Sequence, residues 1–335
     1  MSLKEVAKRA GVSSATVSRV LNNTNVVRNA TRLRVIKAVE ELSYYPNIHA
    51  RTLAGGKSRT LGMIASNLEN PFFFDIFRTL ESDAHAKGYE VVVANTDYRP
   101  EQLVTSVRTM LERRVAGLAV IVSETTPELT RELAASKIPV VFYDAATPHP
   151  NIFNIYTNYR RGIERVVDYL HSLGHRRLAF VGHHSTLGPT GEREKVFVET
   201  VSRFASTSEW RTVADEDGPE GGRQAVREVL ASGFRPSAIV CVNDFMAIGV
   251  LRELLDQGLR VPQDVSVTGF DNIKLSEFSY PRLTTVHIPR ERIGRFVFER
   301  LVPDATRKPV GREILLDPEF VLRESTGPAP KSGHP

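Results

Sequence analysis

Apolar residues at helical spacing open the chain and predict a short first helix. The apolar stripe consists of Leu3, Val6, Ala7 and Ala10, at positions i, i+3, i+4 and i+7. Gly11 follows where a helix commonly ends in a left-handed residue, and Ser13 can cap a second helix after a two-residue turn. Two short helices joined so tightly predict a helix-turn-helix.

The second and third helices complete a small core. Inward positions of the second helix are Val17, Val20 and Leu21. A third helix is expected from about residue 30 to 42, before Tyr45-Pro46 ends it, and its inward positions are Val35, Ile36, Val39 and Leu42. Residues 1–45 are therefore predicted to form a small all-α headpiece.

The exposed face of the second helix is suited to the major groove of DNA. This face presents Ser14, Ala15, Ser18, Arg19 and Asn22, and Thr16 is a further candidate DNA contact. Arg19 can offer two donors to guanine and is the predicted base-reading residue, whereas Ser14 and Thr16 suit phosphates or either type of base. Ala15 can only touch a thymine methyl group. The alternative for Arg19 is a solvated helix arginine, which this basic three-helix pattern disfavours.

Residues 46–59 form a predicted hinge between the headpiece and the body. Asn47 can cap a two-turn helix that ends at Gly55-Gly56, and so short a helix is marginal alone. If two copies meet over a minor groove, Leu53 can wedge between base pairs with Arg51 near phosphates. The alternative is a flexible linker whose Leu53 docks on the body, and the composition favours neither.

The pattern changes after residue 60, where apolar runs alternate with amphipathic helical segments up to about residue 325. Such runs include LGMIASN, YEVVVANT, GLAVIVS, PVVFYDA, RLAFVGH, AIVCVND and DVSVTGFD. This alternation predicts parallel sheets covered by helices on both faces, in two doubly wound lobes that divide around Tyr156. Ligands of such sheets bind beyond the carboxyl ends of the strands. The cleft between the lobes is therefore the predicted site.

Six residues at or just beyond these strand ends are candidates for binding a small molecule. They are Phe72, Phe73, Ser123, Arg193, Asn243 and Asp271. Together they offer donors and acceptors beside an aromatic wall, which suits a sugar-like or other small polar ring. The alternatives are plain core residues for the two phenylalanines and a surface charge for Arg193. Asp244 is expected to be a helix N-cap outside the site.

The distribution of charge supports a nucleic-acid-binding module joined to a neutral body. Residues 1–59 hold 11 Lys and Arg but three Asp and Glu, whereas the remainder holds 33 and 36, so the net charges are +8 and −3. No apolar stretch approaches a membrane span, and the amino terminus is charged, so a soluble, cytoplasmic protein without membrane partners is expected. A single cysteine, Cys241, cannot form an intramolecular disulfide.

Catalytic, cofactor and metal motifs find no support. The chain has no G-x-S-x-G elbow, P-loop or G-x-G-x-x-G sequence. Histidine pairs at 171/175 and 183/184 are weak evidence for zinc, because Gly174 favours a helix end at the first pair and the second has no third ligand in reach by sequence. We therefore predict no enzyme, cofactor or metal site. Two other classes remain, a solute-binding protein and a carbohydrate-processing enzyme fused to a DNA-binding module.

The headpiece and hinge resemble a known family. LKEVAKRAGVSSATVSRVLN and ATRLRVIKAVEELSYYPNIHARTLAGGKSRTLG are similar to the headpiece and hinge helix of the lactose-repressor and purine-repressor family. NPFFFDIF, VVFYDA, GHRRLAFVGH, CVNDFMAIGVL, GLRVPQDVSVTGFDN and PRLTTVHIP follow that family's effector-binding core in order. The resemblance covers residues 3 to about 324.

The resemblance implies a transcription regulator, most simply a repressor, with a periplasmic-binding-protein-like core over residues 60–325. It implies a homodimer, or a dimer of dimers, on near-palindromic operator DNA, with Leu53 as the intercalating hinge residue and a small-molecule effector in the cleft. Asp217 stands where the family often stacks an aromatic ring on its ligand, which suggests a more polar or cationic effector. Residues 326–335 are expected to be a disordered tail without tetramerising heptads.

Overall fold

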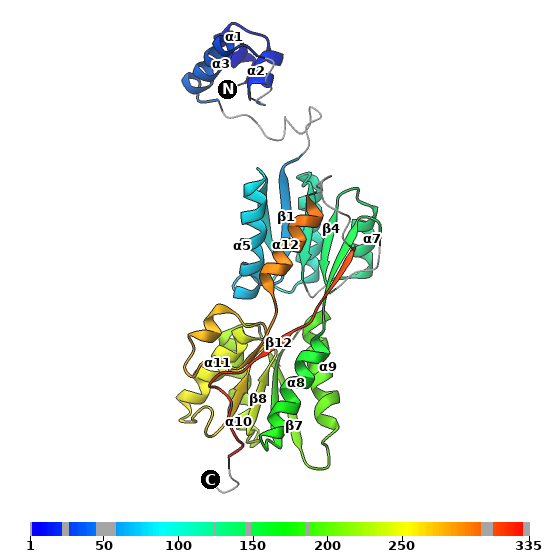
Figure 1. The fold of residues 1–335 in the computed structure, drawn as a ribbon, viewed down its shortest axis with the longest axis vertical. Helices are drawn as coiled ribbons and strands as arrows, with labels where there is room; N and C mark the ends of the chain where they lie inside the picture. Colours follow the sequence, from blue (N-terminus) through cyan, green and yellow to red (C-terminus); the bar gives the residue numbers. More distant parts are fainter. Residues whose placement is uncertain are drawn as a thin grey trace. The chain divides into compact units, whose positions relative to one another are not determined.

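The computed structural model describes residues 2–21, 27–44, 58–122, 125–144, 149–184, 188–302 and 311–330. They belong to two compact units, residues 1–58 and 59–335, which are described separately (Figure 1). Among its described residues, the first unit contains three helices, α1 Leu3–Ala10, α2 Ser14–Leu21 and α3 Asn29–Glu41. The predicted helix-turn-helix headpiece is thereby confirmed.

Local capping fixes the turn between the first two helices. Ser2 and Glu5 form a reciprocal capping box at the start of α1, and Gly11 ends the helix at φ 65° and ψ 42°. The backbone N–H of Thr16 donates to Ser13 Oγ at 3.2 Å, so Ser13 caps α2 as expected. The buried core consists of Val6, Ala7, Ala10, Val17, Val20, Val35 and Ala38.

One predicted core position of the headpiece is wrong. Ile36 is 40% exposed, whereas Val35 and Ala38 are buried and Val39 and Leu42 pack against them. The buried stripe of α3 follows the i, i+3, i+4 rule from Val35, and Ile36 lies one residue, about 100°, away from it.

The second unit consists of two lobes. Lobe 1 begins with β1 Thr60–Ala65, α5 Pro71–Ala86, β2 Glu90–Asn95, α6 Pro100–Glu112, β3 Gly117–Ile121, α7 Pro127–Ala135, β4 Val140–Tyr143 and β5 Ile152–Thr157. Lobe 2 follows with α8 Tyr159–Ser172, β6 Arg177–His183, α9 Gly188–Ser202, β7 Glu209–Asp215, α10 Pro219–Ala231, β8 Ala238–Cys241, α11 Asp244–Asp256, β9 Ser266–Thr268, η1 Lys274–Glu277 and β10 Thr285–His287. The chain then returns to lobe 1 through α12 Arg290–Leu301 and β11 Glu313–Leu316, and re-enters lobe 2 at β12 Glu319–Val321.

Each lobe is built on a parallel sheet, as the alternating pattern predicted. The strand order is β11-β5-β4-β3-β1-β2 in lobe 1 and β7-β6-β8-β9 in lobe 2, and all neighbours are parallel. In lobe 1, Met63 belongs to the core under α5 and α12, whereas its neighbour Ile64 belongs to the core under α6 and α7. The sheet is thus covered on both faces.

The lobe boundary near Tyr156 was expected, but the return of the chain to lobe 1 was not. Strand β11 pairs with β5, and α12 packs beside α5 (Figure 1).

Residues 326–330 also differ from the expected disordered tail, because they are hydrogen bonded to lobe 2. Gly327 O lies 3.0 Å from His175 Nε2, and Ala329 N donates to Leu173 O at 2.9 Å.

Helices α10 and α11 pack so closely that side chains are excluded at their crossing. A Cβ atom added at Gly249 would overlap the carbonyl oxygen of Pro219, and one at Gly222 would overlap that of Met246. In a helix interior, alanine is more stable than glycine by about 1 kcal/mol. If an alanine variant is nevertheless less stable than the wild type, the loss comes from this overlap. These glycines are therefore required by packing.

We expect Gly249→Ala to lower the free energy of unfolding by about 1–3 kcal/mol, because α10 and α11 must separate to admit the methyl group. Urea denaturation followed by circular dichroism measures the loss. Arg252→Ala on the exposed face of α11 is the matched control and should change stability by less than about 0.5 kcal/mol. Equal stabilities of the glycine variant and the wild type would contradict the close packing.

Candidate functional site

Five of the six predicted small-molecule residues line one cavity between the lobes. Phe72, Phe73, Arg193, Asn243 and Asp271 surround a space of about 30 Å³. The sixth, Ser123, lies outside the described residues. Seven residues that we did not predict share the lining: Asn70, Tyr98, Val122, Tyr143, Tyr159, Pro189 and Thr190. The carboxyl ends of parallel strands thus converge here, as the topology requires.

The aromatic wall comes from the start of α5. Asn70 caps this helix by accepting a hydrogen bond from Phe72 N at 3.0 Å, and Pro71 occupies the first helical position. Phe72 and Phe73 are buried, with ring centroids 5.3 Å apart in an edge-to-face arrangement. They are core residues as well as cavity residues, so the two interpretations of these rings do not exclude each other.

Arg193 is a buried cation on α9 and not the surface charge that was its alternative. Its side chain is only 8% exposed. Its Nε donates to Pro189 O at 3.1 Å and its Nη1 to Val242 O at 2.7 Å, while the rings of Tyr159 and Phe270 flank the guanidinium. These contacts fix the group at the cavity wall.

Asp271 is the buried acid that faces Arg193. Its Oδ1 lies 3.7 Å from Arg193 Nη1, and its backbone has a φ of 103° just beyond β9. Burial raises the pKa of Asp271 to about 8, although the positive charge of Arg193 acts in the opposite direction. A buried, incompletely neutralised acid in a cleft is typical of a binding site.

Asn243, and not Asp244, is the capping residue of α11. Asn243 Oδ1 accepts from Met246 N at 2.8 Å, so Asn243 caps α11 while it also lines the cavity. Asp244 is the first residue of the helix and is fully buried. It accepts from Ile273 N at 2.8 Å and from the hydroxyls of Ser276 and Thr285. The predicted N-cap at Asp244 is therefore wrong.

Sequence reasoning missed a hydroxyl and carboxylate cluster at the back of the cavity. Tyr159 OH donates to Asp144 Oδ2 at 2.7 Å and lies 3.1 Å from Tyr143 OH. Burial raises the pKa of Asp144 to about 7, against the lowering effect of the Tyr159 hydrogen bond. Tyr143 and Asp144 end the apolar run PVVFYDA, and that position at a strand end was the signal that could have revealed them.

A wider cavity lies at the mouth of the cleft. It measures about 750 Å³ and is lined by Asn67, Glu69, Asp97, Tyr98, Arg99, Pro100, His183, His184, Glu216 and Asp217. Tyr98 lines both cavities, and its ring lies 4.3 Å from that of His183 across the lobes. Asp217 lines this outer cavity and is hydrogen bonded to Asn70 and Asn243, which line the inner one.

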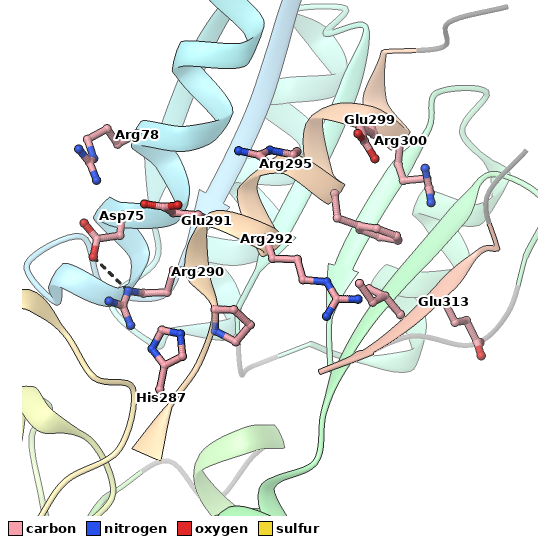
Figure 2. Close-up of a pocket in the computed structure, with 13 residues that line it drawn as sticks. Asp75, Arg78, His287, Arg290, Glu291, Arg292, Arg295, Glu299, Arg300 and Glu313 are labelled. Carbon is pink, nitrogen blue, oxygen red and sulfur yellow. Dashed lines mark hydrogen bonds and ion pairs between the residues drawn. The ribbon is translucent and has the colours of Figure 1, made fainter. Parts of the chain in front are cut away.

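Arg290 joins the site to lobe 1. Its Nε donates to Asp75 Oδ2 on α5 at 3.0 Å, the contact drawn in Figure 2, and its Nη2 donates to Asn272 O at 2.7 Å. Its Nη1 donates to the carbonyl of Asp271. Arg290 and Asp75 also line a third cavity of about 690 Å³ along α5 and α12, shown in Figure 2. The backbone of the cleft acid is thus held from the other lobe.

The candidate DNA-reading face of α2 is exposed. Ala15 and Arg19 are exposed, whereas Val17 and Val20 are buried on the opposite side. Ser14 and Thr16 are half-buried, and Thr16 Oγ1 lies 3.0 Å from Ser13 Oγ. Asn22, Arg51 and Leu53 lie outside the described residues.

The histidines have structural surroundings in lobe 2. His171 stacks on Phe204 with centroids 3.7 Å apart, and His175 Nδ1 lies 3.1 Å from Ser237 Oγ. Burial lowers the pKa of both imidazoles. Within the described ranges, no group of three potential ligands could hold a metal ion. No helix of the described chain has the length and apolarity that a membrane crossing requires.

Comparisons with known proteins agree with both units. Residues 2–47 match the family described as bacterial regulatory proteins, lacI family, and residues 167–326 match the periplasmic binding protein-like domain. The HTH-type transcriptional repressor PurR of Vibrio cholerae serotype O1 (strain M66-2) is 35% identical over 98% of this chain and 99% of its own length.

Solved structures extend the likeness to three dimensions. The lac repressor dimer bound to operator and the anti-inducer ONPF is 29% identical, with a TM-score of 0.80 over 98% of this chain and 99% of that one. A LacI family transcriptional regulator from Silicibacter pomeroyi is 28% identical, with a TM-score of 0.85 over the same shares. This chain therefore belongs to the lacI family of bacterial regulatory proteins and is a DNA-binding transcriptional regulator, not an enzyme.

Proposed function

We propose that this protein is a cytoplasmic repressor that binds a near-palindromic operator as a homodimer and changes its operator affinity when a small polar molecule binds between its lobes. The observation that carries the proposal is the convergence of Phe72, Phe73, Arg193, Asn243 and Asp271 on one cavity, in a chain that also has a basic helix-turn-helix unit. Ser123 is proposed to join these residues.

The lining of the cleft favours an effector with a ring and several polar substituents. Aromatic side chains offer faces for the ring, while Arg193 and Asp271 offer a donor group and an acceptor group. A sugar or a related polar metabolite has this chemistry. The carboxylate of Asp217 at the mouth favours hydroxyl-rich or cationic molecules over anions.

The DNA contacts are proposed for the exposed face of α2 and for the hinge. Arg19 reads a base, Ala15 touches a thymine methyl group, and Ser14, Thr16 and Asn22 contact phosphates or base edges. Leu53 wedges into the minor groove with Arg51 near phosphates. The lac repressor, which this chain resembles, is bound to operator as a dimer in its solved structure, which supports the proposal that this chain binds operator DNA.

An exposed apolar surface on lobe 2 supports the dimer. Leu275 in η1 is 47% exposed, and Phe278 and Tyr280 just beyond it are 74% and 93% exposed. Large apolar side chains grouped on a surface mark an interaction site more often than a free surface. We propose that a second copy of this chain covers them, and that the dimer does not require the tail.

The proposed function is tested by selecting an operator from random DNA and titrating it with the protein, with and without a panel of metabolites. Metabolites are first ranked by thermal shift, because a ligand at 100 times its Kd adds about 2.7 kcal/mol of stability. A selected palindrome whose affinity changes with a stabilising metabolite supports the proposal. Failure to enrich any DNA sequence would contradict it.

Replacing Arg19 tests base reading directly. Arg19→Ala should lose discrimination at one base pair per half-site, at a cost of about 1–3 kcal/mol there, and should leave binding to unrelated DNA nearly unchanged. Fluorescence anisotropy with a set of single-base operator variants measures the effect. An equal loss of affinity for every sequence would make Arg19 a phosphate contact instead.

A further inference from the structure

The carboxylate of Asp217 lies where the two lobes meet. Its Oδ2 accepts from Tyr98 OH at 2.8 Å, from Asn67 Nδ2 at 3.0 Å and from Asn70 Nδ2 at 3.4 Å. Those three residues follow β1 and β2 of lobe 1, whereas Asp217 follows β7 of lobe 2. One side chain of lobe 2 therefore accepts hydrogen bonds from two loops of lobe 1.

A fourth donor ties Asp217 to its own lobe. Asn243 Nδ2 donates to Asp217 Oδ1 at 2.7 Å, so both carboxylate oxygens are used. Asn243 follows β8 and is one of the candidate effector residues. Asp217 thus connects the loops of lobe 1 to the part of lobe 2 that lines the inner cavity.

Backbone hydrogen bonds orient the three asparagine side chains so that their amide nitrogens can donate to Asp217. The side-chain oxygen of each accepts a backbone N–H: Asn67 from Glu69, Asn70 from Phe72 and Asn243 from Met246. Because the oxygen is engaged, the amide nitrogen of each side chain is the atom left to face the cleft. The fold therefore directs three amide groups and one phenol toward a single acceptor position.

Asp217 fills that acceptor position from within the chain. The inner cavity that remains measures about 30 Å³, far below the roughly 300–1,000 Å³ of a typical ligand pocket, so a sugar-sized ring does not fit. The space on the outer side is about 750 Å³. The network around Asp217 lies at the boundary between these two spaces, because Tyr98 lines both of them.

We infer that Asp217 is a built-in latch: its carboxylate bridges the loops at the ends of β1, β2 and β8 and holds the cleft closed before any effector binds. An effector that enters the inner cavity has to break these hydrogen bonds and offer acceptors of its own to the same donors. The consequence for operator affinity rests on the proposed function, whereas the closure itself does not.

The closure is tested with the ligand-free, full-length protein carrying one nitroxide label on each lobe. Glu101→Cys on α6 and Glu220→Cys on α10 provide exposed labelling positions, and the native Cys241 is buried. Double electron–electron resonance measures the distance between the labels. Asp217→Ala should lengthen or broaden the distance distribution, because the hydrogen bonds across the lobes lose their acceptor.

Two further variants keep the test decisive. Tyr98→Phe removes one donor from lobe 1 and should shift the distances in the same direction by a smaller amount. Glu216→Gln is the matched control, because Glu216 is the exposed neighbour of Asp217 and makes none of these bonds, and its distances should equal those of the wild type. Distances unchanged in Asp217→Ala, or in Tyr98→Phe if the alanine variant does not fold, would overturn the latch.

Operator titrations separate the latch from the proposed function. The ligand-free Kd of Asp217→Ala for the selected operator should differ from that of the wild type by about fivefold or more, the lower range of typical allosteric coupling. A wild type that binds no operator would contradict the proposed function and leave the distance result standing. A shifted distance distribution with an unchanged Kd would overturn the link between closure and DNA binding.

Discussion

Raising the salt concentration from 50 to 200 mM is expected to weaken operator binding by about a thousandfold. Residues 1–59 carry a net charge of +8, and the proposed dimer would bring two such segments to the DNA. Each phosphate neutralised by a protein cation releases counterions and contributes about 0.9 to the slope of log affinity against log salt, so six or more contacts give this loss. Anisotropy titrations at four or five salt concentrations measure the slope.

A control separates this effect from changes in the protein. Thermal unfolding over the same salt range should move little, because the ion pairs of the headpiece, such as Arg9 with Glu41, are at the surface. Unrelated DNA should give a similar slope at lower affinity, since phosphate contacts carry no sequence information. An affinity independent of salt would contradict the DNA-binding role of the basic segment.

Asp271→Ala is expected to abolish the response of operator binding to the effector while ligand-free binding stays near that of the wild type. An effector can shift the two states of the cleft only by its difference in affinity for them, typically about 1–3 kcal/mol, or about 5- to 150-fold in operator affinity. Asp271 lies in the inner cavity beside Arg193, and we propose that it contributes to that difference. Operator titrations with and without the selected effector measure the response.

Asp168→Ala, an exposed position on α8 of the same lobe, is the control and should respond like the wild type. If operator binding by Asp271→Ala responds to the effector at the concentrations that suffice for the wild type, Asp271 is not part of the effector site. Arg193 and Asn243 would then lose support as well, since both line the same cavity.

The raised pKa of Asp271 adds a pH dependence with a definite sign. Because its pKa in the folded protein is about 8, the folded state binds this proton more tightly than the unfolded chain, where an aspartate pKa is about 3.9. The stability that this group contributes is present below about pH 4 and is lost as the pH rises to about 8. Asp271→Asn, which resembles the protonated acid, should show a smaller decrease over that range in urea denaturation.

Local patterns in the sequence were sufficient for the helix-turn-helix unit, for the two parallel-sheet lobes and for five of the twelve residues that line the inner cavity. The helical stripe ending at Gly11 and the cap at Ser13 depend on neighbouring residues, so the helix-turn-helix could be predicted. In parallel sheets the carboxyl ends of the strands meet at one edge, and position in the chain alone placed Asn243 and Asp271 near each other. The net charge of residues 1–59 was counted from the sequence alone.

The sequence alone could not decide which of two adjacent polar residues enters the cleft. Asn243 and Asp244 both follow β8, and the structure buries Asp244 against Ser276 and Thr285, which lie 32 and 41 residues away. Such hydrogen bonds depend on how distant elements pack, and nothing in the local sequence near Asp244 specifies its partners. A similar limit applied to the return of α12 and β11 to lobe 1, because both read as ordinary members of an alternating series.

Asp217 shows the same division most clearly. The sequence alone revealed that an acid stands in the loop before α10 where the resembling family often has an aromatic ring. Only the tertiary structure determined what the acid contacts, because its donors come from residues 26 to 150 positions away in two different lobes. The sequence pattern therefore determined the DNA-binding unit, the two-lobed body and the sheet edges at which ligands bind. The packing of the two lobes determined which side chains meet at those edges, because their partners lie far apart in the sequence.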